Sequence, residues 1–296
     1  MSLPENKHLK KIGLAITKKY VWLLLGILIA AELIGIAISA FITSVTTNTF
    51  ALIISFILNG FVSTFVFMGF FHAINKAFYH HQPTTADLFF PIHKPKMWLR
   101  ATAVNTIGTA IMLIAVYVFI VVIILSTLFS VFGGVFVGGV FATGSFTDYS
   151  LSVIVIGLTV LVLCILITLC YFSVLGCFTL SVYFSALRNP NILFEQLLEK
   201  SLKLTKRLLF RFVKLCLSFT GWFCTCILWS IFVIAMMYES FKQAIYPYTP
   251  YFSIAAAPLS IVAIALICIP FLLLLVYFCC TASAFFNTNM DFLEQN

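Results

Sequence analysis

The chain has 296 residues, of which 62% are hydrophobic and only 9% are charged. Soluble domains carry about 25% charged residues, so this composition excludes a water-soluble globular protein and requires lipid to cover much of the apolar surface. The net charge of +8 comes from residues that flank apolar runs and form no separate basic domain. We therefore expect membrane lipids, and not nucleic acid, as the partner of these charges.

The basic residues divide the chain at regular intervals. All of the 17 Lys and Arg residues except Lys242 fall within residues 7–19, 76–100 and 188–214. Because Lys and Arg are retained on the cytoplasmic side of a membrane, these stretches and both termini are predicted to be cytoplasmic. The fold class that follows is all-α, a polytopic helical bundle forming one integral membrane domain over residues 1–296 in the cytoplasmic (inner) membrane.

Six apolar runs are long enough to cross a bilayer, since about 20 residues span its hydrocarbon core of about 30 Å. The first run is too long for a signal peptide and lacks a small-residue cleavage site after it, so we expect it to remain as a span. All nine cysteines lie in apolar runs, which predicts buried thiols and no disulfide framework. The predicted spans are about 20–44, 50–75, 101–131, 151–186, 208–238 and 253–286.

Glu32 is the acidic residue placed well inside a predicted span, and an intramembrane carboxylate is a candidate functional group. Small and polar residues, including Ser39, follow it at helical spacing and predict a face that points into the bundle. Asn59 of the second span lies at a similar depth. We predict a hydrogen bond between Glu32 and Asn59 or a nearby hydroxyl, with Glu32 largely protonated. The same residues are open to two interpretations, a structural carboxyl or a proton or substrate site.

The sequence offers little support for metal or catalytic chemistry. His80, His81 and His93 share one connection, but a zinc site needs three or four convergent ligands and a supporting shell, so a surface loop is favoured. The chain contains no H-E-x-x-H and no G-x-S-x-G motif. We therefore expect no metal, no cofactor and no enzymatic activity.

The connection between the fourth and fifth spans predicts an amphipathic helix on the cytoplasmic membrane surface. Asn189 and Pro190 are typical of a helix start. Glu199 and Lys203 form a favourable pair at spacing i, i+4. The predicted apolar face holds Phe194, Leu197, Leu198 and Leu202, and the residues predicted to meet the membrane surface are Lys200, Lys203, Lys206, Arg207 and Arg211.

Two short runs in this region carry a resemblance. Residues 199–206 (EKSLKLTK) and 215–222 (LCLSFTGW) resemble the segment after the fourth span in a family of uncharacterised bacterial six-span membrane proteins. That family is similar to the membrane domain attached to some glycerophosphodiester phosphodiesterases. The chain departs from its pattern at Arg207, where glycine is frequent, and at Thr220, where an aliphatic residue is frequent. The resemblance implies a membrane domain without established catalysis, since likeness of fold alone settles no function.

Three functions remain open from the sequence. The favoured one is a non-catalytic membrane protein that binds lipid or another membrane protein. The alternative is a small transporter or permease subunit with Glu32 in its pathway, where Pro258 and Pro270 would break helices. An intramembrane enzyme is the third, and it would require turnover that depends on Glu32.

Overall fold

The computed structural model describes residues 5–45, 49–111, 114, 117–118, 121, 171–245 and 252–295. Within these ranges the chain is helical apart from short turns, and no strand occurs there, so the all-α prediction is confirmed for the described residues. By length and composition, five helices in the described part are long and apolar enough to cross a membrane. They lie within residues 6–38, 60–78, 171–188, 194–236 and 265–293.

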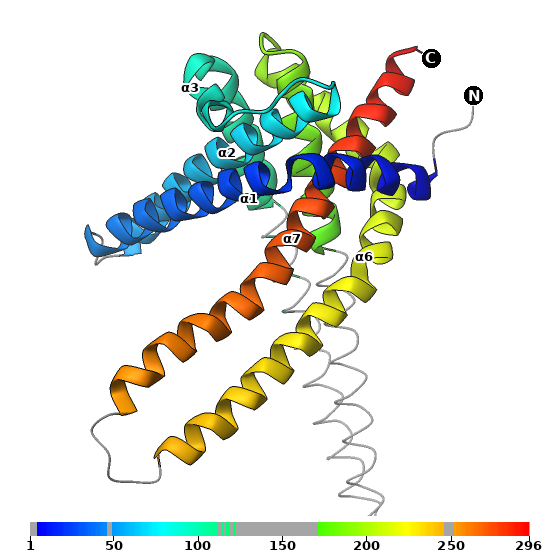
Figure 1. The fold of residues 1–296 in the computed structure, drawn as a ribbon. Coiled ribbons are helices and arrows are strands. Elements are labelled where there is room, and N and C mark those ends of the chain that lie inside the picture. Colours follow the sequence, from blue (N-terminus) through cyan, green and yellow to red (C-terminus); the bar gives the residue numbers. More distant parts are fainter. Residues whose placement is uncertain are drawn as a thin grey trace, which may run out of the picture.

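The N-terminal third is a helical hairpin. Helix α1 covers Asn6–Val45 and contains a non-helical backbone conformation at Tyr20, the residue where the first span is predicted to begin. Helix α2 covers Thr49–Phe78, and the two helices lie side by side (Figure 1). A short 3₁₀ helix, η1 (Thr85–Phe89), and a single turn, α3 (Phe90–His93), follow and pack on α2. The next helical stretch begins at residue 95 and is described to residue 111.

In the C-terminal half, the helix over residues 171–188 is followed by the two longest helices of the described chain. Helix α6 covers Phe194–Ile245 and helix α7 covers Phe252–Gln295, and they pack against each other. In the second half of α6, the Trp229 indole N–H donates to the carbonyl of Leu266 in α7 at 3.0 Å. Figure 1 shows that the α1–α2 pair leaves the shared end of the molecule in a different direction from the α6–α7 pair.

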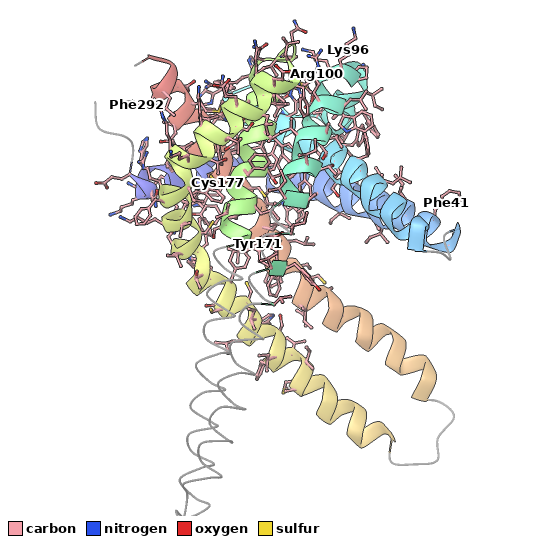
Figure 2. All side chains as sticks on the ribbon, turned by 180° about the vertical axis from the view of Figure 1, so that it is seen from behind. Phe41, Lys96, Arg100, Tyr171, Cys177 and Phe292 are labelled. Carbon is pink, nitrogen blue, oxygen red and sulfur yellow. The ribbon has the colours of Figure 1, made fainter. Side chains whose placement is uncertain are left out.

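Packing is concentrated at the end of the molecule where α1 begins and α7 ends (Figure 1), the end that carries Phe292 in Figure 2. In α6 the buried residues recur at helical spacing from Leu197 to Phe219, and beyond them the described apolar side chains are mostly exposed. In α7 the buried residues run from Leu274 to Met290. The exposed apolar remainder suits contact with lipid, because lipid tails solvate such side chains as well as a protein core does.

The amphipathic segment before the fifth span is built differently from the prediction. Residues 190 and 191 form a turn and α6 begins at Phe194, so the predicted helix start at Asn189 is wrong. From Phe194 the amphipathic segment continues as helix into the span. The backbone amide of Asn189 instead bonds to the carbonyl of Ser185 and closes the preceding helix. Leu197 is fully buried in the protein core, whereas Leu202, predicted on the same face, is 51% exposed.

The start of α1 crosses α7 at very short range. A Cβ atom on Gly13 would overlap the Oγ1 atom of Thr281 and lie 2.8 Å from the Cα atom of the same residue. Lys10, one turn earlier, donates to the carbonyl of Ser218 at 2.8 Å and lies over the ring of Phe219 at 4.4 Å. Glycine therefore permits this crossing, and Lys10 fixes α1 against α6 as well.

We predict that Gly13→Ala destabilises the protein by about 1 to 3 kcal/mol, the usual effect of forcing extra volume into a packed site. Thermal unfolding in detergent micelles measures the change. Gly26→Ala is the matched control in the same helix, because a Cβ atom there meets nothing within 4 Å. Equal effects of the two substitutions would contradict the close crossing.

Candidate functional site

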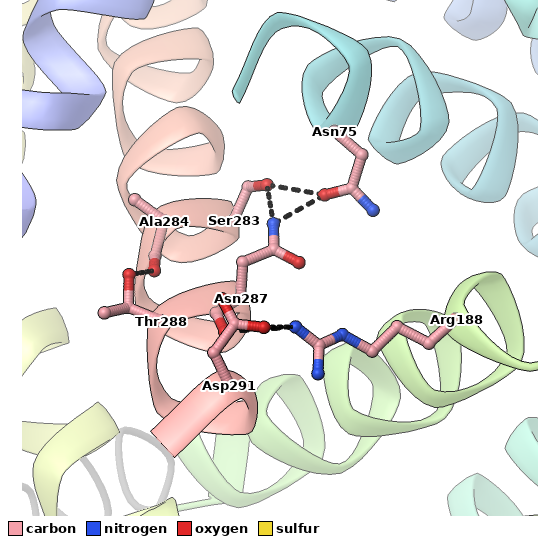
Figure 3. Close-up of polar contacts among 7 residues, drawn as sticks. All are labelled: Asn75, Arg188, Ser283, Ala284, Asn287, Thr288 and Asp291. Carbon is pink, nitrogen blue, oxygen red and sulfur yellow. Dashed lines mark hydrogen bonds and ion pairs between the residues drawn. The ribbon is translucent and has the colours of Figure 1, made fainter. Parts of the chain in front are cut away.

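Polar side chains on the last turns of α7 connect it to α2. Ser283 and Asn287 are spaced by one helical turn and both are buried. The Asn287 side-chain amide donates to the Oδ1 atom of Asn75 at 2.6 Å, and the Ser283 hydroxyl donates to the same oxygen at 3.2 Å (Figure 3). Because a buried amide is costly to leave unpaired, these bonds fix how α7 rotates against α2.

Two arginines hold the same end of α7 from other helices. Arg188, at the end of the helix over residues 171–188, forms an ion pair with Asp291 and donates to the carbonyl of Asn287 at 3.4 Å (Figure 3). Arg211 of α6 donates to the Oδ1 atom of Asn289 at 2.6 Å. We call the side chains of Asn75, Arg188, Arg211, Ser283, Asn287, Asn289 and Asp291 the α7 clasp.

A cavity of about 440 Å³ lies beside the clasp, between the start of α6 and the end of α7. This volume falls in the range of small-molecule binding sites, about 300 to 1,000 Å³. We call it the α6–α7 groove. Its lining residues are Asn189, Ile192, Gln196, Glu199, Lys200, Lys203, Leu204, Arg207, Met290 and Leu293.

The groove combines a cationic side with an apolar side. Lys200, Lys203 and Arg207 contribute three positive charges and Glu199 one negative charge, so the lining has a formal charge of +2. Lys203 is paired with Glu199, with 2.5 Å between Nζ and Oε1. Among the described residues Arg207 has no side-chain partner, which leaves its guanidinium available to a ligand. Ile192, Leu204, Met290 and Leu293 form the apolar side.

The predicted membrane-surface residues separate into three groups in the structure. Lys200, Lys203 and Arg207 line the groove. Lys206 is exposed on α6 outside the groove, and Arg211 points to Asn289 in the clasp. From the sequence alone, these five basic residues are predicted to meet the membrane surface together. Their contacts with α7 in the structure show that they have different surroundings.

The predicted intramembrane site involves Glu32, Ser39 and Asn59. The backbones of these residues belong to α1 and α2, which do form an adjacent hairpin. Their side chains lie outside the described residues, so the hydrogen bond between Glu32 and Asn59 stays a prediction.

The histidines do not converge. His80 and His81 are exposed at the turn after α2, and His93 lies in a second cavity beside Lys94 and Lys96. In the described ranges no three metal-ligating side chains gather at one point. His72, from the end of α2, stacks on the ring of Phe90 at 3.7 Å between centroids.

Asp87 docks the connection after α2 onto that helix. It is 6% exposed, forms an ion pair with Lys76, and accepts a hydrogen bond from the Thr84 backbone amide at 2.7 Å. Burial by itself would raise the pKa of Asp87, but the bonds from Lys76 and Thr84 outweigh burial and hold the pKa below its ordinary value. Asp87 is therefore charged, and its contacts stabilise the folded connection.

Sequence reasoning missed the clasp. The signal available was the spacing of Ser283, Asn287 and Asp291 at i, i+4 and i+8, a polar stripe that starts at the end of the last apolar run and continues beyond it. Their partners, Asn75 and Arg188, are far away in the sequence, so the pattern could not show that these residues meet.

No family model, no curated protein and no solved structure matches this chain. The resemblance drawn from residues 199–206 and 215–222 therefore stays a prediction.

We predict that Asp291→Asn loosens the end of α7. Loss of this half-exposed ion pair should cost about 1 kcal/mol, which corresponds to about fivefold faster amide hydrogen exchange over residues 285–293. Hydrogen exchange with mass spectrometry measures it. Glu195→Gln is the control, since Glu195 is an exposed acid on α6 with no partner among the described side chains. Unchanged exchange in Asp291→Asn would show that Arg188 does not hold α7.

We predict a pH-dependent effect of Asp87→Asn. With a folded-state pKa below the unfolded value of about 3.9, Asp87 contributes stability above that value, and the contribution disappears as pH falls through the folded-state pKa. At pH 7 the variant should be about 1 to 3 kcal/mol less stable than the parent. Thermal unfolding in micelles at pH 7 and below pH 3 tests this, and a difference that persists unchanged at the lower pH would contradict it.

Proposed function

We propose that the protein is a non-catalytic, multi-pass protein of the cytoplasmic membrane that binds an anionic lipid headgroup in the α6–α7 groove. One observation carries this proposal. The same cavity is lined by the guanidinium of Arg207, which is available to a ligand, and by the apolar side chains of Met290 and Leu293. A phospholipid has the same two-part character, because its phosphate is charged and its glycerol and acyl carbons are apolar.

Arg207 is the phosphate ligand in this proposal. Its guanidinium presents a planar fork of N–H donors that matches two phosphate oxygens, and such charge-assisted bonds are stronger than neutral ones. Lys200 adds a second positive charge to the same lining. Leu204 and Ile192 complete the apolar side of the lining.

The length of α6 supports a groove at headgroup depth. A helix of 52 residues is about 78 Å long at 1.5 Å per residue, whereas the hydrocarbon core is about 30 Å thick. The surplus must lie outside the hydrocarbon, and eight of the ten charged residues of α6 lie in its first 21 residues, up to Lys214. In the proposed topology six spans cross the membrane, both termini are cytoplasmic, and the groove faces the cytoplasmic leaflet.

The chemistry of the lining favours binding over turnover. In the described part of the chain, the groove lining includes no Ser, Cys or His side chain that could act as a nucleophile or proton carrier. Its acid, Glu199, is paired with Lys203. The proposal therefore assigns the groove a recognition role.

We predict that Arg207→Gln weakens binding of short-chain phosphatidylglycerol about tenfold, equivalent to about 1.4 kcal/mol. Native mass spectrometry of the delipidated protein in neutral detergent measures the affinity. Lys206→Gln is the matched control, because it removes the same charge from the adjacent position, outside the groove.

Two results would contradict the proposal. Equal losses in Arg207→Gln and Lys206→Gln would indicate attraction by net charge only. Unchanged binding in Arg207→Gln, with thermal unfolding like that of the parent, would remove the groove as the lipid site.

A further inference from the structure

We infer that the lipid bound in the α6–α7 groove carries hydroxyl groups on its headgroup, as a glycerol or inositol phosphodiester does. The inference rests on the proposed function and names the class of ligand for the same site. It comes from two side chains of the lining that the phosphate does not require, Asn189 and Gln196.

Both side chains end in amides that are available to a ligand. In the parts of the chain that the structure describes, neither the Asn189 nor the Gln196 side chain has a hydrogen-bond partner. Each amide offers two N–H donors and one carbonyl acceptor. A hydroxyl group also donates and accepts, so it can use both halves of an amide, whereas a phosphate oxygen can only accept.

The backbone that carries Asn189 is fixed. Its amide donates to the Ser185 carbonyl at 3.2 Å, and its carbonyl accepts from the Ile192 amide at 3.1 Å. Arg100 donates to the carbonyl of Ile192 at 2.7 Å and to that of Asn191 at 3.2 Å. The turn is thus tied to the helix over residues 95–111 as well as to the helix over residues 171–188, and it presents Asn189 from a constant position.

Charge disfavours the two common zwitterionic headgroups. Choline and ethanolamine headgroups each carry a cation and no further anion, so the cation would meet a lining of formal charge +2. A headgroup of hydroxyls brings no such charge and leaves the phosphate as the sole ionic group. Selectivity then depends on hydroxyl hydrogen bonds, which discriminate more sharply than apolar contacts do.

The test compares two lipids of equal charge. Phosphatidylglycerol and phosphatidylethanol with the same acyl chains are both phosphodiesters with one negative charge, and only the first has headgroup hydroxyls. Native mass spectrometry of the full chain in neutral detergent should show about tenfold tighter binding of phosphatidylglycerol. Gln196→Leu and Asn189→Ala should each lower its affinity toward that of phosphatidylethanol, whose own affinity stays unchanged.

If Gln196→Leu unfolds, Gln196→Glu gives a second variant, in which the side chain has the same length as that of glutamine. It keeps an acceptor but removes the N–H donors, and its negative charge opposes the phosphate, so binding of both lipids should fall.

Arg207→Gln separates the inference from the proposed function, because it should weaken both lipids equally. Equal affinity of the parent protein for the two lipids would overturn the inference, and the proposed function would still stand if Arg207→Gln lowers that affinity. Insensitivity of both lipids to Arg207→Gln would overturn the proposed function itself. Soluble glycerophosphoglycerol should fail to displace phosphatidylglycerol at equal concentration, and displacement would identify a free phosphodiester, not a lipid, as the ligand.

Discussion

The end of α7 is held by side chains from three other helical segments, and the α6–α7 groove depends on that hold. Asn75, Arg188 and Arg211 all form polar contacts with residues of its last turns. Met290 and Leu293 lie among those turns and form one side of the groove. The α7 clasp adds polar contacts to the aromatic packing of α6 on α7, and together they keep these two side chains opposite Arg207. The shape of the groove therefore depends in part on polar contacts outside it.

The same contacts account for where the protein is compact. Helices in lipid gain little from burying apolar surface against each other, because lipid tails solvate that surface equally well. Hydrogen bonds, ion pairs and close backbone approach must then provide specificity. They gather at one end of this molecule, in the α7 clasp, at Asp87 with Lys76, and where Gly13 meets Thr281. The apolar stretches that leave this end in two directions are tied by fewer polar contacts, such as Trp229 to Leu266.

Much of the helical layout could be predicted from residue patterns. The basic clusters locate the connections, the break at Tyr20 falls where the first span is predicted to start, and the Glu199–Lys203 pair follows from spacing alone. The orientation of the amphipathic segment could not be predicted, since an apolar face is equally suited to lipid and to protein. Leu197 packs in the protein core. Whether an apolar helix face meets protein or lipid depends on residues that are far away in the sequence. The groove has the same origin, because residues 196–207 and 290–293 meet only after folding.

Cross-linking with a photoreactive phosphatidylglycerol in membranes tests the central claim most directly, because it locates bound lipid without altering the protein. The diazirine should be on the headgroup, and labelled peptides should be mapped by mass spectrometry. The account predicts that labels concentrate in residues 189–207 and 290–293 and that unlabelled phosphatidylglycerol reduces them. Labels spread over the exposed apolar faces of α6 and α7, with none in these two stretches, would contradict it.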